Sequence, residues 1–477
     1  MSRPQKLAFI DPGLRKAPFF LELRRALAPR IDCVYYSRRR LVRAHVRSVD
    51  APLFPKRTSA KRPLYAISDA ELREAIGEKE WQLRRDKALR KAPWLLGELA
   101  AFLDEQAVDA LLIWNGGNLC GALAIWLARR RGLPVIFAEH GYLPRTTQLD
   151  LDGVNVLSSL TQAVHDGTAM LAPDPDVDAA LDADIDAYRS GHPMRLADAR
   201  IPDIHLRDPW VRLSRRIISF VKSTLRGRSA AAVLPGTPDA PDLPPFLLLP
   251  FQVRKDSQLA LHSPLLGNDM RRFLAVVDEA RRAVAPNLPL VVKLHPYEHI
   301  KVLRQYRDLP TQFPQVHFVS REPITALLPK CAAVVTINST VGFEAMLFDK
   351  PVVTLGHNFY TVAGLVESAE SLAMLPDALR HALTQPIDHA RRRAFLRYVH
   401  ARFLVFGSYD DFSERSVQAV AARIKELLPA AQSPALGTSA TLTETGWHEG
   451  ANRAEGLRPA MLADSDSGLM AMDWPTR

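Results

Sequence analysis

The chain has 477 residues. A single hydrophobic core rarely extends over a chain of this length, so we expect two domains. Hydrophobic residues make up 47% and charged residues 24% of the sequence, which excludes a wholly disordered chain, a collagen-like fibre and a small disulfide scaffold. The net charge of +10 favours an anionic partner, which can be nucleic acid, a lipid surface or an acidic small molecule.

Neither a membrane span nor a metal-binding cysteine pattern is predicted. No run of about 18 apolar residues is present, and the N-terminus resembles a first strand rather than a signal peptide. The three cysteines, Cys33, Cys120 and Cys331, are far apart and form no zinc pattern. We therefore expect a protein of the reducing cytoplasm.

Short apolar runs alternate with helical stretches in the first 140 residues. Strands are predicted at residues 6–11, 31–36, 110–115 and 134–139, and helices at 17–27, 69–106 (with a break near Pro93) and 119–131. This alternation is typical of a parallel sheet in an α/β domain. We assign residues 1–175 to an N-terminal Rossmann-like domain.

Periodicity fades from about residue 173 to residue 245, and we interpret 176–245 as a basic insertion and linker. Residues 207–228 carry a net charge of +6. Apolar residues recur at helical spacing within 210–225, which predicts an amphipathic basic helix suited to an anionic inner-membrane face. The alternative is an ordinary surface helix. Nucleic acid is not expected, because no nucleic-acid-binding signature accompanies the charge.

A second α/β series begins at residue 246. Strands are predicted at residues 246–252, 290–294, 316–320, 333–338 and 351–355, and helices at 270–284, 324–330, 340–348, 369–383, 389–403 and 413–428. We assign 246–429 to a C-terminal Rossmann-like domain with closing helices, and predict disorder for 430–477. Two Rossmann-like domains facing a central cleft match the GT-B architecture of many sugar-nucleotide glycosyltransferases.

The sharpest motif, AVVTINSTVGFEAMLFDKPVVTLG, spans residues 333–356. A predicted strand ends at Asn338, and Ser339 and Thr340 begin the next helix. Hydroxyl groups, free backbone N–H groups and the helix dipole at such a place suit a phosphate. The alternative is an ordinary helix N-cap.

Further residues of the second domain extend this phosphate site. Gly342 is interpreted as letting a ligand approach the helix closely, and Glu344 as accepting hydrogen bonds from ribose hydroxyls. The motif VVKLHP ends a predicted strand at His295-Pro296, so that Lys293 or His295 can neutralise a leaving phosphate. The alternative for His295 is a structural role.

Carboxylates in two more motifs are candidates for catalysis. Asp256 lies in LPFQVRKDSQ after the first strand of the second domain, and Glu139 ends a strand of the first domain in EHGYLPRTTQLDLDGVN. We expect both side chains to reach the cleft. The alternatives are a solvated turn for Asp256 and a salt bridge for Glu139. Asp152 precedes Gly153, and Asp-Gly is typical of a turn, so we first interpret Asp152 as a structural residue.

These four motifs, in this order, resemble the capsule polysaccharide biosynthesis family, the Kps-type and related retaining β-Kdo glycosyltransferases, where Kdo is 3-deoxy-D-manno-octulosonic acid. The similarity covers roughly residues 110–160 and 245–360. The family's first-domain motif often has Asn, Asp or Gln where this chain has His140.

The resemblance implies transfer of Kdo, or a related ulosonic sugar, from a CMP-Kdo-like donor to a capsular or lipopolysaccharide-type glycan or glycolipid. Retention would use a carboxylate nucleophile, with Asp256 as the first choice and Asp152 as the second. Glu139 would be the base that activates the acceptor hydroxyl. The residues implied for donor binding are Lys293, His295, Pro296, Asn338, Ser339, Thr340, Gly342 and Glu344, and those for the acceptor side are His140, Tyr142 and Gln252.

No cofactor is expected, and a donor with one phosphate need not use a metal. We favour a metal-independent site, although Asp150-Leu-Asp152 has the spacing of a metal-binding pair. Two alternatives stay open. One is a transferase of the same shape with a UDP- or CDP-linked donor, and the other is a non-catalytic capsule assembly or export factor.

Overall fold

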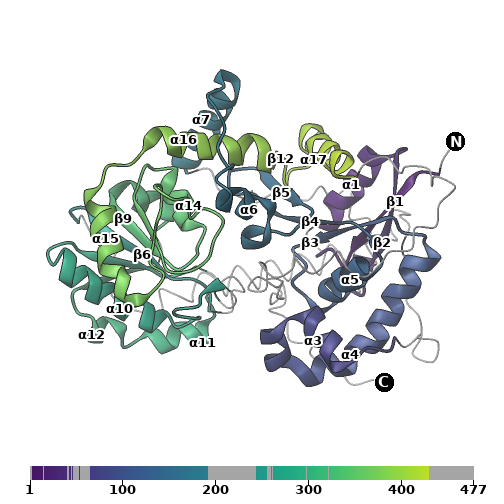
Figure 1. The fold of residues 1–477 in the computed structure, drawn as a ribbon, viewed down its shortest axis with the longest axis horizontal. Coiled ribbons are helices and arrows are strands. Elements are labelled where there is room, and N and C mark those ends of the chain that lie inside the picture. The colour runs from purple at the N-terminus through teal and green to yellow at the C-terminus, as the bar shows by residue number, and fades with distance from the viewer. Residues whose placement is uncertain are drawn as a thin grey trace, which may run out of the picture.

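Two α/β domains lie side by side in the computed structural model of the chain (Figure 1). The structure describes residues 3–13, 16–39, 42–43, 46, 53, 65–191, 243–254, 259, 262–296, 298–320 and 322–428. Asp256, the basic segment 207–228 and the tail 430–477 lie outside the described residues, so what the sequence predicts for them stays a prediction.

The first domain is built on a six-stranded sheet in the order β12-β5-β4-β3-β1-β2. Four parallel strands follow the predicted pattern: β1 (Gln5–Ile10), β2 (Ile31–Tyr36), β3 (Ala110–Trp114) and β4 (Val135–His140). Alternate residues of β1 pack on opposite faces: Leu7 faces α1 (Ala17–Leu27), and Ala8 faces α5 (Leu119–Arg130). The sheet is therefore covered by helices on both faces, which explains its nearly continuous apolar strands.

The long helical region breaks earlier than predicted. Two helices, α3 (Asp69–Ile76) and α4 (Glu78–Glu105), meet at Gly77, which has φ +78° and ψ 154°. A glycine adopts this conformation at little cost, and it cannot continue a helix. Pro93 lies inside α4, so the predicted break at Pro93 is wrong.

Two strands that the sequence did not predict complete the first sheet. β5 (Thr146–Asp150) runs antiparallel to β4, and β12 (Leu404–Phe406) runs antiparallel to β5. The chain therefore returns to the first domain near its C-terminal end. There α17 (Glu414–Leu427) packs beside α1, and Lys425 donates to the Ala26 carbonyl at 2.8 Å. Assigning residues 404–427 to the second domain was wrong, because their strand pairing joins them to the first.

The second domain has a parallel sheet in the order β11-β10-β9-β6-β7-β8. Its strands are β6 (Phe246–Pro250), β7 (Leu290–Lys293), β8 (Val316–Val319), β9 (Cys331–Thr336), β10 (Val352–Thr354) and β11 (Glu367–Ser368). Its helices include α10 (Met270–Val284), α13 (Ile324–Leu327), α14 (Val341–Met346), α15 (Leu375–Thr384) and α16 (His389–Tyr398). The strand order reverses between β6 and β9, and ligands of open α/β sheets bind at such a switch point.

Part of the segment interpreted as a linker is an ordered helix on the second domain. Asp174 caps α7 (Pro175–Arg189) by accepting from the backbone N–H groups of Asp176 and Val177 at 3.0 and 3.2 Å. In Figure 1, α7 stands next to α16, which runs along the top of the view toward β12. The interpretation of this segment as an aperiodic linker is therefore wrong for residues 176–189.

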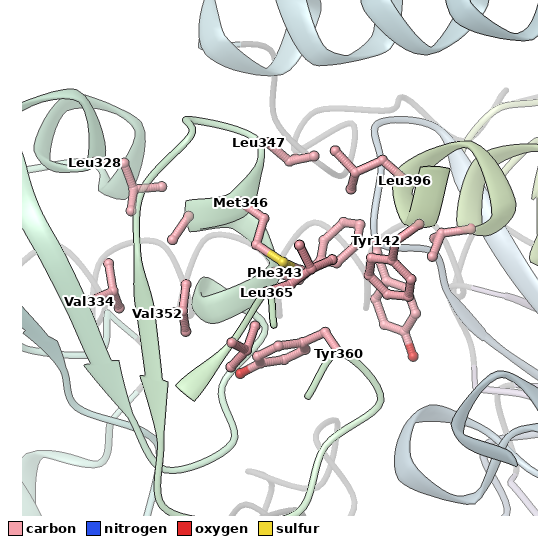
Figure 2. Close-up of a cluster of buried hydrophobic side chains, with 14 of the residues drawn as sticks. Tyr142, Leu328, Val334, Phe343, Met346, Leu347, Val352, Tyr360, Leu365 and Leu396 are labelled. Atoms are coloured by element: carbon pink, nitrogen blue, oxygen red, sulfur yellow. The ribbon is translucent and has the colours of Figure 1, made fainter. Parts of the chain in front are cut away.

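One hydrophobic cluster joins the two domains. Tyr142, which follows β4, belongs to the same buried cluster as Phe343, Phe359 and Leu396 of the second domain, and Figure 2 shows Tyr142 beside Phe343 and Leu396. Tyr142 and Phe359 follow the carboxyl ends of β4 and β10, so these ends of the two sheets are directed toward the junction. The GT-B-like expectation of two Rossmann-like domains is confirmed. Of the described helices, none combines the length and apolar character needed to cross a membrane.

Candidate functional site

The switch point of the second sheet is held by an amide pair. Gln252, just past β6, donates from Nε2 to Asn338 Oδ1 at 2.9 Å, and the Asn338 N–H donates back to Gln252 Oε1 at 3.3 Å. Both side chains are buried. We expected Gln252 on the acceptor side, but in the structure it bonds to Asn338, a residue expected on the donor side. Its role in the structure is to fix the ends of two adjacent strands.

Lys293 and His295 lie at the same edge, at the end of β7. Lys293 is buried, and its Nζ donates to the carbonyls of Leu294 and Ser320 at 2.8 and 2.9 Å. Burial lowers the pKa of Lys293 to about 8, and burial together with the Lys293 charge lowers the pKa of His295 to about 4. At neutral pH the ammonium is therefore the cationic member of the pair. Pro296 follows and is exposed.

Ser339 and Thr340 directly precede α14, close to the predicted helix start, but their side chains bond within the chain. The Ser339 hydroxyl accepts from the Val341 N–H at 3.2 Å. The Thr340 hydroxyl donates to Glu344 Oε1 at 3.3 Å. The Ser339 hydroxyl thus accepts from the first backbone N–H of α14 and occupies one of the N–H groups that a phosphate was expected to use.

The space beside Gly342 is filled by protein. A Cβ atom built on Gly342 would lie 2.4 Å from the hydroxyl oxygen of Tyr360, whose ring is fully buried. That hydroxyl donates to the Ser339 carbonyl. The expectation that Gly342 admits a ligand is wrong in this structure, because the missing side chain makes room for Tyr360.

Glu344 is also occupied by protein groups. It is buried, and the phenol of Tyr188 on α7 donates to its Oε2 while Thr340 donates to its Oε1. Burial raises the pKa of Glu344. The expectation that Glu344 accepts ribose hydroxyls is therefore replaced by a structural role, in which it ties α7 to the second domain.

Glu139 lies at the carboxyl edge of the first sheet, as predicted. Its Oε2 accepts from Asn115 Nδ2 at 2.9 Å, and its Oε1 accepts from the His140 N–H at 2.8 Å. Asn115 follows β3 with φ +48°, and its Oδ1 accepts from the Gly117 N–H at 2.8 Å. The half-buried carboxylate is thus held in one orientation. The predicted site omitted Asn115, although the sequence WNGG after a strand was a usable signal.

Aromatic rings surround His140 beside Glu139. The ring centroid of His140 lies 5.2 Å from that of Trp114 and 4.9 Å from that of Tyr409. The Lys16 ammonium lies 4.9 Å from the Trp114 centroid and 5.2 Å from the Tyr409 centroid. The sequence did not indicate this group, since Tyr409 arrives only with the return of the chain through β12. Half-buried aromatic rings at a strand edge can contact the faces of a sugar.

Asp152 lies away from Glu139. In the antiparallel pairing Phe137 lies opposite Asp150, so β5 runs toward the amino end of β4 and Asp152 lies beyond that point. Burial and the Asp150 charge raise the pKa of Asp152, and Arg129 at the end of α5 opposes them. The structure thus contradicts Asp152 as a nucleophile near Glu139, because the two carboxylates sit at opposite edges of the sheet.

The Asp150-Leu-Asp152 pair also lies outside the site. Asp150 Oδ1 accepts from the N–H groups of Asp152 and Gly153 at 2.8 and 3.2 Å, which makes it a turn residue. Over the described ranges there is no group of three or more His, Cys, Asp or Glu residues arranged to hold a metal.

Tyr142 packs in the buried cluster that joins the two domains. Its side chain is 3% exposed, and its hydroxyl donates to Gln148 Oε1 at 3.0 Å. Burial raises its pKa well above the usual value. We expected Tyr142 to contact the acceptor, but the ring is covered by the second domain.

A family model and several known proteins match this chain. Residues 109–403 match the family model described as capsule polysaccharide biosynthesis protein. Protein FixF of Sinorhizobium fredii is 28% identical over 323 residues, which are 67% of each chain. The capsule polysaccharide export protein KpsS of Escherichia coli is 29% identical over 258 residues, which are 50% of this chain and 64% of the relative. The solved structure of Thermosulfurimonas dismutans KpsC, beta Kdo 2,7 transferase, matches 89% of this chain and 99% of its own at 13% identity and a TM-score of 0.43.

Proposed function

The chain belongs to the capsule polysaccharide biosynthesis family, and from that premise we propose that it is a glycosyltransferase. It moves Kdo, or a related ulosonic sugar, from a CMP-sugar to a capsular or lipopolysaccharide-type glycan. The observation that carries this proposal is the placement of a held carboxylate, Glu139, and a buried ammonium, Lys293, at the carboxyl ends of strands in two adjoining Rossmann-like domains.

The donor phosphate is assigned to the second domain. Two protons of the Lys293 ammonium are directed to backbone carbonyls, which leaves the third for a phosphate oxygen. His295, neutral at pH 7, and the Ser339 hydroxyl supply further donors. Their hydrogen bonds gain strength as negative charge develops on the departing CMP.

The acceptor is assigned to the first domain. Glu139 takes the proton of the attacking hydroxyl, and the bond from Asn115 keeps its carboxylate oriented. Trp114, His140 and Tyr409 then contact the faces of the acceptor sugars. Retention can be achieved by two inversions through a second carboxylate as nucleophile, and Asp256 is proposed for that role from the sequence motif.

Attachment to the inner-membrane face is proposed for the basic segment 207–228, on the strength of its +6 charge. Vesicles of acidic phospholipid should retain the protein at low salt and release it as salt screens the charge. Replacing Arg215, Arg216 and Lys222 by Glu should abolish retention while turnover on a soluble acceptor persists. Loss of that turnover would place the segment in the core or the acceptor site.

A panel of donors tests the transferase proposal. The protein is incubated with CMP-Kdo, or with UDP- or CDP-linked sugars, together with a synthetic glycan acceptor, and nucleotide release is measured. Release of CMP that depends on the acceptor is expected. Release of UDP or CDP instead would keep the transferase and change its donor.

A non-catalytic export factor is the second candidate, because the matched Escherichia coli relative is described as an export protein. Calorimetry separates the two candidates. A folded protein that binds none of the donors and releases no nucleotide supports the export factor and refutes the transferase.

A further inference from the structure

A pocket of about 250 Å³ lies between α7, the turn after α14 and α16, and none of the candidate site residues lines it. Since α14 leads from the carboxyl end of β9 to the amino end of β10, Leu347 and Asp349 lie toward the opposite edge of the sheet from Ser339. The pocket is therefore separate from the candidate catalytic site.

Arg392 of α16 is among the residues that line this pocket, and its guanidinium is buried and unsatisfied. The residue is 2% exposed, and none of its three guanidinium nitrogens has a hydrogen-bond partner within the described part of the chain. The nearest opposite charge is Asp349, whose Oδ1 lies 4.0 Å from Nη1. Burial lowers the pKa of Arg392 to about 10, so the group stays charged at neutral pH. A buried charge without hydrogen bonds destabilises a fold, and a ligand that supplies acceptors removes this penalty.

Two neighbouring arginines are paired with carboxylates. Arg393 binds Asp178 and Asp182, and Arg189 binds Asp349 at 3.0 Å. The salt bridges of these two arginines therefore leave the Arg392 guanidinium as the site for an added anion. Apolar side chains form another part of the wall: Met346, Leu347 and Leu396, which Figure 2 shows close together.

We propose that this pocket binds an acidic sugar, whose carboxylate or phosphate accepts two hydrogen bonds from the Arg392 fork. A planar guanidinium matches two acceptor oxygens of one anion. Asp186, an exposed residue of α7 that also lines the pocket, accepts hydroxyl protons of the same ligand. The volume is below that of pockets for drug-sized ligands and suits one sugar unit. The inference does not depend on the proposed transfer reaction.

Calorimetry on the full chain tests the proposal with glucuronate and glucose 6-phosphate as probes and glucose as the neutral control. Wild-type protein should bind the probes and not glucose, and the two probes tell carboxylate from phosphate. Arg392→Met should weaken binding by about 30-fold or more. Arg391→Met, on the exposed neighbour in α16, and Lys293→Met, in the candidate catalytic site, should leave it unchanged.

Thermal unfolding without ligand supplies a second readout. Arg392→Met removes a buried charge that has no hydrogen bonds and keeps a side chain of similar length, so its Tm should equal or exceed that of the wild type. Arg392→Lys keeps the charge but loses the fork, so it should fold and bind at least about tenfold more weakly. Failure of wild-type protein to bind either probe, or equal binding by Arg392→Met, overturns the proposal. A lower Tm for Arg392→Met assigns the guanidinium a structural role and overturns it as well.

Discussion

The ring of Tyr142 in the first domain lies on the ring of Phe359 in the second, with centroids 3.7 Å apart and planes inclined by 10°. This stack belongs to the buried cluster that joins the two domains at the carboxyl ends of β4 and β10. The relative position of the two half-sites therefore depends on packing at Tyr142.

Replacing Tyr142 by Ala should lower the free energy of unfolding by about 3–5 kcal/mol, because the truncation leaves a cavity in a shared core. Tyr142→Phe retains the stack and loses only the hydrogen bonding of the hydroxyl to Gln148 Oε1 and Asn155 Oδ1, which should cost about 1 kcal/mol. Denaturant unfolding measures both effects. An acceptor KM that rises in Tyr142→Phe without loss of stability would return this residue to the acceptor site.

Gly342→Ala should destabilise the second domain by about 1–3 kcal/mol, because the new methyl group would overlap Tyr360. Tyr360→Leu removes the obstructing ring, so adding Gly342→Ala to that variant should cost less than it does alone. Thermal unfolding of the two single variants and the double variant gives the coupling. Weaker donor binding by Gly342→Ala at an unchanged Tm would instead support close approach of a ligand.

The buried Glu344 predicts a pH dependence of stability. Its pKa is raised in the folded protein, so the native state holds a proton that the unfolded chain has already released. Its contribution to stability is therefore full below the unfolded pKa, and it is lost as pH rises through the higher folded pKa. The free energy of unfolding of the wild type, relative to Glu344→Gln, should fall as pH increases from about 4. Parallel pH profiles for the two proteins would contradict this assignment.

Much of this fold could be predicted from local sequence, and the differences lie where distant residues meet. The apolar runs predict β1 and β3, and Ser339 was correctly placed at a helix start. β12 has only three residues and gains its identity from pairing with β5, which lies more than 250 positions earlier. The helix α7 was missed because its acidic residues lie in a stretch where no clear apolar periodicity was recognised. Its start at Asp174-Pro175 is nevertheless a helix signal.

The candidate site was predicted less completely than the fold, for the same reason. Lys293 and Glu139 could be placed because a strand end determines where their side chains emerge. Gly342 and Glu344 were misassigned because Tyr360 and Tyr188, which fill their surroundings, come from other segments of the chain. A local motif with a glycine or a buried hydrogen-bond acceptor can accommodate either a ligand or a tyrosine side chain. Only tertiary packing shows which of the two is present.

Donor affinity should depend on the protonation of Lys293. Burial places its pKa at about 8 in the free protein, so the ammonium is present at pH 7 and is lost in more alkaline solution. A bound phosphate favours the protonated form, so the affinity for CMP should decline above pH 8 by up to about tenfold per unit. Lys293→Met should bind CMP more weakly and show no such decline in calorimetry. A wild-type affinity that stays constant from pH 7 to about pH 9.5 would remove Lys293 from the phosphate site.

The most direct test of the proposed transfer is mass spectrometry of a synthetic glycan acceptor after incubation with the protein and CMP-Kdo. The proposal predicts an acceptor heavier by one Kdo unit with wild-type protein. It predicts that Glu139→Gln loses at least about a hundredfold in rate while still binding CMP. An acceptor mass that stays unchanged with wild-type protein that binds CMP-Kdo, or full activity of Glu139→Gln, would contradict the account.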